Sequence, residues 1–186
     1  MSFFLSNDQE AIKDSVKKIC DRFPLQYWRD QDKNGEFPED FVKAITDGGW
    51  LGIAMPEEYG GAGLGIMEAA VLANTISNSG AGFSGASAVH LNLFGPHPIV
   101  VFGTEEQKKR FLPPLIKGED RACFAVTEPD SGLNTMALKT EAVRDGDNYI
   151  INGRKLWTTT AQTANKILLI TRTSAIDSGA PPGKSL

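Results

Sequence analysis

The first part of the chain repeats its apolar residues at helical spacing. After Ser6, a residue type suited to cap a helix, Ile12, Val16 and Ile19 recur four and three positions apart. Pro24 then stands where this helix is expected to stop. The pattern predicts an amphipathic helix close to the N-terminus.

The stretches that follow alternate between charged and apolar composition. Residues 29–36 are mostly charged and are interpreted as a solvated loop. Pro38 stands where a second helix would begin, and Gly48-Gly49 where it would end. A third helical pattern, rich in Ala, Leu and Val, covers residues 66–76.

Two more helical segments precede residue 120. Residues 83–101 mix Ala, Val and Leu with Gly and Pro, which predicts a buried helix followed by a break. Thr104 and Gln107 have the spacing of a capping box, in which two side chains satisfy the first amides of a helix. The helix that they begin is expected to run through Ile116 and to end at Gly118.

From Asp120 onward the pattern changes to short β-like runs separated by Gly, Asp and Asn. These runs cover residues 122–126, 138–143, 149–151, 155–159 and 166–171, and Asp145-Gly146-Asp147 is a hairpin signal. We therefore predict an α+β protein with an all-helical N-terminal domain at residues 1–119. Residues 120–186 are expected to form an antiparallel β-barrel-like domain. It is expected to be incomplete, since no closing element follows the loop at residues 178–183.

Composition narrows the possible classes of protein. The net charge of −4 comes from interspersed acidic and basic residues, which argues against nucleic-acid binding. No apolar run is long enough to cross a bilayer. Cys20 and Cys123 give no disulfide framework, and the N-terminus lacks the basic start of a targeting peptide. The expected location is the cytoplasm, or the mitochondrial matrix if a targeting peptide has been removed.

Two features resemble ligand sites but favour simpler interpretations. The Gly-rich stretch at residues 57–65 lies between helices, whereas a dinucleotide-binding loop follows a strand. It is interpreted as a flexible connection between two helices. His90 and His97 have no Cys or carboxylate at ligand spacing, so no metal site is expected.

Four strings, in their order along the chain, carry a more specific signal. Residues 50–61 read Trp-Leu-Gly-Ile-Ala-Met-Pro-Glu-Glu-Tyr-Gly-Gly, and residues 103–108 read Gly-Thr-Glu-Glu-Gln-Lys. Residues 126–132 read Val-Thr-Glu-Pro-Asp-Ser-Gly, and residues 150–159 read Ile-Ile-Asn-Gly-Arg-Lys-Leu-Trp-Thr-Thr. Together they resemble the acyl-CoA dehydrogenase family of flavoproteins over essentially the whole chain.

The resemblance implies an oxidoreductase of fatty acid metabolism. Family members have an N-terminal helical domain, a middle β-domain and a C-terminal four-helix domain, with FAD between the last two. They are usually homotetramers. The implied reaction is α,β-dehydrogenation of an acyl-CoA thioester: a glutamate removes the α-proton and the β-hydrogen leaves as hydride to the flavin. Electron-transfer flavoprotein is the usual acceptor of the electrons.

The resemblance also implies which residues contact FAD: Phe124, Ala125, Val126, Thr127, Gly132, Leu133, Trp157, Thr158 and Thr159. The first four would line the isoalloxazine ring, and Trp157 would form an aromatic wall beside it. The Thr159 hydroxyl is the expected partner of the flavin N5. The alternative for Trp157 is an ordinary core tryptophan with its N–H satisfied.

Two departures from the family pattern bear on catalysis. Leu133 stands where the family commonly has a serine that contacts substrate or flavin, so only its backbone N–H could bind substrate. The family's catalytic glutamate lies in the C-terminal domain, whereas Glu128 belongs to a turn and Glu141 to a strand. No catalytic residue is assigned, and the 186 residues are expected to be the front part of a dehydrogenase that does not turn over alone.

Two alternatives stay open from the sequence. An acyl-CoA oxidase would share the fold and pass its electrons to oxygen. A catalytically inactive short form would serve as a binding or assembly module.

Overall fold

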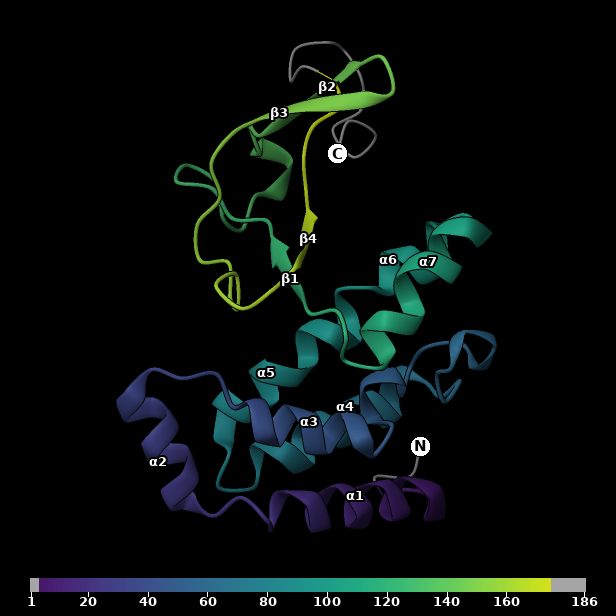
Figure 1. Cartoon of the computed structure of the whole chain (residues 1–186), viewed down its shortest axis with the longest axis vertical. Coiled ribbons are helices and arrows are strands. Elements are labelled where there is room, and N and C mark those ends of the chain that lie inside the picture. Colours follow the sequence, from purple (N-terminus) through teal and green to yellow (C-terminus); the bar gives the residue numbers. More distant parts are fainter. Residues whose placement is uncertain (1–3, 175–186) are drawn as a thin grey trace. The chain divides into compact units, whose positions relative to one another are not determined.

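The computed structural model describes residues 4–174, so the loop predicted at residues 178–183 lies outside the described part (Figure 1). The chain divides into two compact units, Met1–Ala122 and Cys123–Leu186. The helices of the first unit are α1 (Asn7–Cys20), α2 (Leu25–Asn34), α3 (Glu39–Asp47), α4 (Ile66–Ser77), α5 (Gly82–Phe94), α6 (His97–Phe102) and α7 (Glu105–Ile116). The 3-10 turns η1 (Trp50–Gly52) and η2 (Glu57–Tyr59) lie between α3 and α4.

Capping boxes begin the first and last helices of this unit. At α1, the amide of Gln9 donates to Ser6 Oγ (3.2 Å) and the Ser6 amide donates to Gln9 Oε1 (3.0 Å). At α7, Thr104 and Gln107 exchange the same two bonds at 3.2 and 2.8 Å. The helix starts predicted at Ser6 and Thr104 are therefore confirmed.

The charged stretch after Pro24 is a helix, and the prediction of a loop at residues 29–36 is wrong for most of its length. The residues just before that stretch explain why α2 forms. Trp28 is buried, and its ring packs edge-on against Phe41 of α3 with 4.9 Å between the ring centroids. Its indole N–H donates to the Phe23 carbonyl (3.2 Å). A single buried aromatic anchor outweighs the charged residues, which face solvent along the rest of the helix.

The core of the helical unit lies between α1, α3, α4 and α5. α1 packs on α4, and α4 packs on α5. The largest side chains of this core are fully or almost fully buried and belong to Val16, Phe41, Ile45, Leu51, Ile53, Leu72, Ile76 and Val89. Cys20 is buried in the same cluster as a free thiol.

The Gly-rich stretch at residues 57–65 connects η2 to α4 and is held by its own backbone. The amides of Gly61, Ala62, Gly63 and Leu64 donate to carbonyl oxygens of residues 52–56 at 2.8 to 3.1 Å. These N–H groups are therefore used within the fold. The interpretation of this stretch as a connection between helical elements is confirmed, and its flexibility stays a prediction.

A buried asparagine fixes the end of the helical unit. Asn92 of α5 accepts a hydrogen bond from the Ala122 amide (3.1 Å) and donates to the carbonyls of Leu115 (3.4 Å) and Asp120 (3.3 Å). Since a buried amide needs such partners, Asn92 ties the last turn of α7 to the start of the following strand. Asn92 thus fixes the last residues of the helical unit, up to Ala122.

The second unit contains strands β1 (Ala122–Ala125, beginning at the boundary), β2 (Glu141–Asp145), β3 (Asn148–Asn152) and β4 (Lys166–Leu169), with the 3-10 turn η3 (Thr135–Ala137) before β2. β1 pairs with β4, and β2 pairs with β3. Among the described residues these are two separate two-stranded sheets, so the α+β arrangement is confirmed and the barrel-like closure stays a prediction. The strand expected at residues 155–159 is absent, and that segment is an irregular loop.

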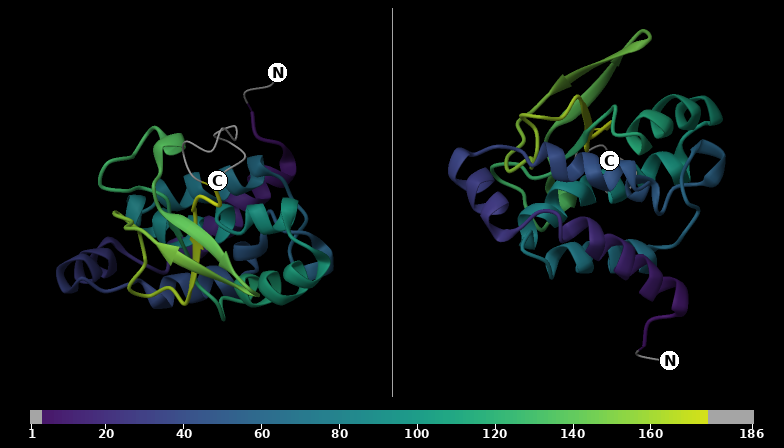
Figure 2. Two further views of the ribbon diagram at one scale, coloured as in Figure 1. Left: turned by 90° about the horizontal axis from the view of Figure 1, so that it is seen from above. Right: turned by 60° about the horizontal axis from the view of Figure 1, so that its bottom comes forward.

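The hairpin signal at Asp145-Gly146-Asp147 is confirmed. β2 and β3 run antiparallel, as the ribbon views in Figure 2 show. In their register Asp145 lies opposite Asn148 and Glu141 opposite Asn152. Gly146 has φ of 61°, a conformation that glycine adopts without strain at such a turn. None of the helices within residues 4–174 has the length and apolar content needed to span a membrane.

Candidate functional site

The first candidate run, residues 124–127, ends in a tight turn of the second unit. Phe124 and Ala125 belong to β1, and the Ala125 carbonyl accepts a hydrogen bond from Ile170 beside β4 (3.1 Å). Beyond the strand, Glu128 and Ser131 exchange two backbone hydrogen bonds of 2.8 and 3.2 Å. The turn is therefore a closed four-residue loop that directly follows Val126 and Thr127.

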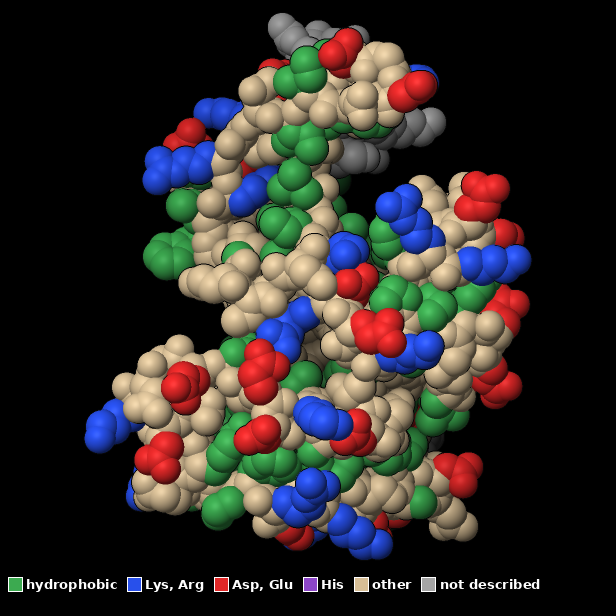
Figure 3. Space-filling model, viewed as in Figure 1, with side chains coloured by type: hydrophobic (Ala, Val, Ile, Leu, Met, Phe, Trp, Pro, Cys, Tyr) green, Lys and Arg blue, Asp and Glu red, His purple; other side chains and the backbone are tan. Residues whose placement is uncertain are grey.

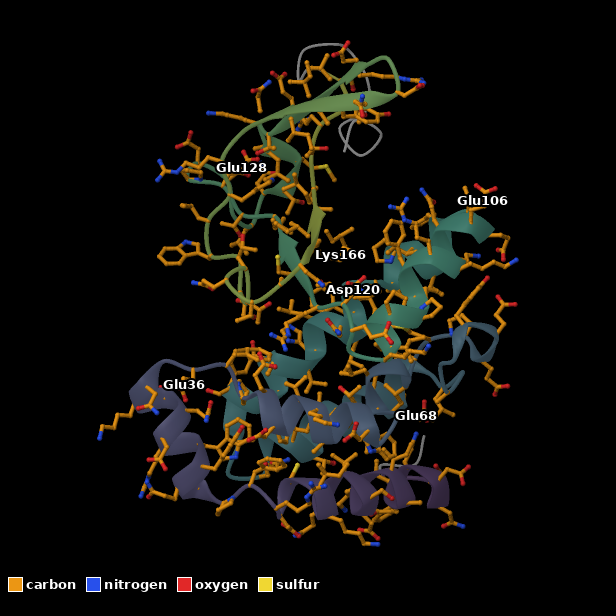
Figure 4. All side chains as sticks on the ribbon, in the orientation of Figure 1. Glu36, Glu68, Glu106, Asp120, Glu128 and Lys166 are labelled. Atoms are coloured by element: carbon orange, nitrogen blue, oxygen red, sulfur yellow. The ribbon has the colours of Figure 1, made fainter. Side chains whose placement is uncertain are left out.

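The Glu128 carboxylate is buried beneath this turn, in the part of the second unit marked in Figure 4. It accepts hydrogen bonds from the amides of Lys139 (2.6 Å) and Thr140 (2.9 Å) and from the ammonium group of Lys155 (2.9 Å). Burial on its own would raise the pKa of Glu128, but the bonds from Thr140, Lys139 and Lys155 outweigh it and lower the pKa to about 2. The group is an anion at neutral pH.

Lys155 brings the two candidate runs together. Its ammonium group donates to the Val126 carbonyl (2.8 Å) as well as to Glu128. The next residue, Leu156, donates its amide to the Thr127 carbonyl (2.8 Å). The segment 153–157, which we call the strap, is thus attached directly to the first run, and Trp157 follows immediately after these bonds.

Gly153 lets the start of the strap approach Thr140 closely. A Cβ atom at Gly153 would lie 2.2 Å from Thr140 Oγ1, far closer than van der Waals contact allows. Thr140 is itself buried, and its hydroxyl is buried without a hydrogen-bond partner. Only glycine therefore fits at this point of the strap.

Trp157 has an uncommon backbone and an uncommon exposure. Its φ is 57°, in the left-handed region that bulky residues rarely adopt, and 86% of the residue is exposed. Such a conformation costs about 1–3 kcal/mol and persists only where the surroundings impose it. Since its indole lies at the surface, the alternative of a buried core tryptophan is wrong.

The residues after Trp157 leave polar groups available. Thr158 and Thr159 begin a tight turn in which the Ala161 amide donates to the Thr158 carbonyl (3.3 Å). The Thr160 hydroxyl donates to the Thr159 carbonyl (2.6 Å). Within residues 4–174, the side-chain hydroxyls of Thr127, Thr158 and Thr159 have no hydrogen-bond partner.

Gly132 and Leu133 lie at the exposed end of the turn after Ser131. Leu133 is fully exposed, and Figure 3 shows that other hydrophobic side chains also reach the surface of this unit. The structure therefore joins residues 124–127 to residues 157–159 through the strap. Gly132 and Leu133 stand on the adjoining turn, whose bonds are made by Glu128, Ser131 and Asn134.

Sequence reasoning missed the residues that hold this arrangement: Glu128, Thr140, Gly153 and Lys155. Glu128 carried one usable signal, because it is a carboxylate shortly after the apolar run of β1. A carboxylate that follows a buried strand is often paired. Its partner Lys155 lies 27 positions away, and nothing in the sequence indicates the pairing.

Comparison with known proteins identifies the family of both units. Residues 6–119 match the profile of the acyl-CoA dehydrogenase N-terminal domain, and residues 123–183 match that of the acyl-CoA dehydrogenase middle domain. The chain is 35% identical over 171 residues to the probable acyl-CoA dehydrogenase YngJ of Bacillus subtilis, covering 91% of this chain and 44% of the relative. It is 34% identical over 174 residues to the 3-(aryl)acrylate reductase of Clostridium sporogenes, covering 91% and 45%.

Solved structures agree with these matches. The acyl-CoA dehydrogenase from Geobacillus kaustophilus aligns with a TM-score of 0.83 at 28% identity, over all of this chain and 48% of that one. A structure described as the FAD complex of PigA shares the fold, with a TM-score of 0.85 at 24% identity over 94% and 46% of the two chains. The chain spans a little under half the length of these relatives. With both of its units matched, the chain belongs to the acyl-CoA dehydrogenase family.

Proposed function

We propose that this chain is the front part of an FAD-dependent enzyme that acts on the α,β-carbon bond of an acyl-CoA thioester. The observation that carries the proposal is the surface at residues 127 and 157–159. The exposed Trp157 indole and threonine hydroxyls without hydrogen-bond partners lie there together, because the strap is fixed to the first run through Lys155. A flat aromatic cofactor with polar edge atoms needs this combination of a wall and hydrogen-bond donors. The residues present therefore fit FAD.

Each segment would hold a different part of the cofactor. Trp157 would pack beside the ring system, and Phe124, Ala125 and Val126 would line it. The hydroxyls of Thr127, Thr158 and Thr159 would donate hydrogen bonds to its polar edge, with Thr159 the proposed partner of N5. The exposed turn at Gly132 and Leu133 would contribute backbone to cofactor and substrate. FAD, when bound, supplies an acceptor for the hydride that leaves the β-carbon.

The base that removes the α-proton is proposed to lie outside these 186 residues. Glu128 is unsuitable because it is buried, paired with Lys155 and held as an anion with a pKa of about 2. A general base works best with a pKa near the operating pH and within reach of the substrate. Glu141 is exposed on β2, within the β2–β3 hairpin. Turnover would then require the remainder of a longer protein, and in its absence no dye reduction is expected.

The assay should cover both directions of the reaction and both electron acceptors. One relative is named as an acrylate reductase, so α,β-unsaturated acyl substrates belong in the panel beside saturated acyl-CoA thioesters. Electron-transfer flavoprotein is the proposed physiological acceptor, and a homotetramer is the proposed assembly. Rapid formation of peroxide without added acceptor would indicate the acyl-CoA oxidase instead.

The decisive experiment uses the protein purified from its native gene. Its intact mass is measured, its flavin is quantified by absorbance, and an acyl-CoA panel is assayed with an artificial dye. A mass about twice 20.1 kDa, bound FAD and acyl-CoA-dependent dye reduction are expected. A stable protein of 20.1 kDa that binds no FAD would overturn the proposal and favour the binding or assembly module. Dye reduction by the 186 residues alone would overturn the placement of the base.

A further inference from the structure

The two runs assigned to FAD meet through one buried ion pair. The side chains of Lys155 and Glu128 are only 9% and 5% exposed, with 2.9 Å between Nζ and Oε1. The pair contacts three segments. They are the residue after β1, through the Val126 carbonyl, the two residues before β2, through the amides of Lys139 and Thr140, and the strap itself. Among the described residues of the second unit this is the buried ion pair, since the Lys139–Asp130 pair lies at the surface.

A buried ion pair is poorly explained by stability alone. Removing two charges from water costs free energy that their mutual attraction largely offsets without a clear surplus, and apolar replacements are often as stable. Such pairs are best attested where they fix one arrangement among several. Here the arrangement that they fix is local: Lys155 lies two residues before Trp157, whose left-handed backbone needs support from its surroundings.

The other bonds of the strap strengthen this interpretation. Leu156 binds the Thr127 carbonyl, and Gly153 rests against Thr140, whose amide binds Glu128. The bonds of Lys155 and Leu156 therefore fix the two residues that directly precede Trp157. On the other side of Trp157 the chain enters the turn at residues 158–161.

We propose that Glu128 and Lys155 are a positioning pair that holds Trp157, Thr158 and Thr159 beside Val126 and Thr127 in the geometry needed to bind FAD. Neither side chain touches the cofactor in this proposal; both act through the strap. The proposal rests on the proposed function for the identity of the ligand. The position of Trp157 is independent of that identity and can be measured without FAD.

The first test uses the 186-residue chain, labelled with 5-fluorotryptophan and observed by ¹⁹F NMR. Trp28, Trp50 and Trp157 give separate probes, and Trp157→Phe assigns the third resonance. In Lys155→Met the Trp157 resonance is expected to shift and broaden, while those of Trp28 and Trp50 in the helical unit stay in place. In the full-length protein the same substitution is expected to weaken FAD binding about tenfold, comparable to losing one charged hydrogen bond.

A matched control and a second variant keep the result interpretable. Lys139→Met removes the same charge from an exposed pair with Asp130 and keeps the Lys139 backbone amide that binds Glu128. It should leave the resonances and the FAD affinity unchanged. Lys155→Met leaves a buried carboxylate without its cation and could unfold the unit. The double variant Glu128→Gln/Lys155→Met removes both charges and is expected to stay folded, with the same shift at Trp157.

The outcomes separate this proposal from the proposed function. A Trp157 resonance that stays at its wild-type position in the folded double variant would overturn the positioning pair. So would unchanged FAD affinity in that variant. A wild-type full-length protein that takes up no FAD would overturn the proposed function, whatever the resonance of Trp157 does.

Discussion

Trp157 combines a left-handed backbone with an indole that is 86% exposed, and both features concern a single residue. If its ring packs beside FAD, Trp157→Ala should remove an aromatic contact worth about 0.5–1.5 kcal/mol beyond simple burial. The dissociation constant of FAD in the full-length protein is then expected to rise about 2- to 10-fold, measured by flavin fluorescence. Tyr149→Ala, an exposed aromatic on β3, serves as control and should change nothing.

Gly153 supports a second prediction at the same scale. In Gly153→Ala the new methyl group would lie 2.2 Å from Thr140 Oγ1, and Thr140 is buried and β-branched, so it cannot move aside cheaply. The free energy of unfolding of the second unit should fall by about 1–3 kcal/mol in urea denaturation. Gly132→Ala has open space around the added carbon and should cost far less. Equal losses in the two variants would refute the role of close approach.

At the scale of elements, the sequence predicted correctly those features that depend on residues close together in the chain. The capping boxes at Ser6 and Thr104 and the hairpin at Gly146 depend on neighbours within a few residues, and the structure has all of them. The prediction of a loop at residues 29–36 was wrong because α2 is stabilised by a contact between Trp28 and Phe41. These two residues lie 13 positions apart, too far for a local sequence pattern to show the contact.

The prediction of a strand at residues 155–159 was wrong for the same reason. The run at residues 155–159 is β-branched and aromatic, which favours a strand. Lys155 instead reaches a carboxylate on another segment, and Trp157 turns into a left-handed conformation. The resemblance to a family predicted which residues would contact FAD. It could not indicate Glu128 and Lys155 as their support, because the pairing exists only in three dimensions.

The Glu128 carboxylate links the turn after β1 to the start of β2, and its ionisation predicts how these elements respond to acid. Its pKa falls from 4.5 in an unfolded chain to about 2 in the folded one. Ionised Glu128 therefore stabilises the fold fully above pH 4.5, and this contribution is lost as the pH falls from 4.5 to about 2. The loss is about 2 kcal/mol, allowing for screening by solvent.

This acid response can be measured by urea denaturation of the second unit across that pH range. Glu128→Gln cannot ionise, so the difference in unfolding free energy between wild type and variant should shrink as the pH falls. A difference that stays constant down to pH 2 would contradict the assignment.

For the molecule as a whole, the two units differ greatly in the size of their cores. Among the largest fully buried side chains, Leu138 and Cys123 belong to the second unit. The first unit holds the others: Phe41, Ile45, Leu51, Ile53, Leu72, Ile76, Leu112, Val16, Val89 and Pro96. Since apolar burial is the main favourable term in folding, the second unit should open more readily than the helices.

Hydrogen exchange of the full chain tests this difference directly. Amides of β2 and β3 are expected to be protected at least about tenfold less than those of α3 and α4. A ligand that binds only the folded state adds stability by mass action, so FAD should raise protection around residues 124–160 first. Equal protection in both units without FAD would show that the small core is sufficient. Protection that rises only in α3 and α4 would mean that the ligand binds the helical unit, contrary to the site proposed on the strap.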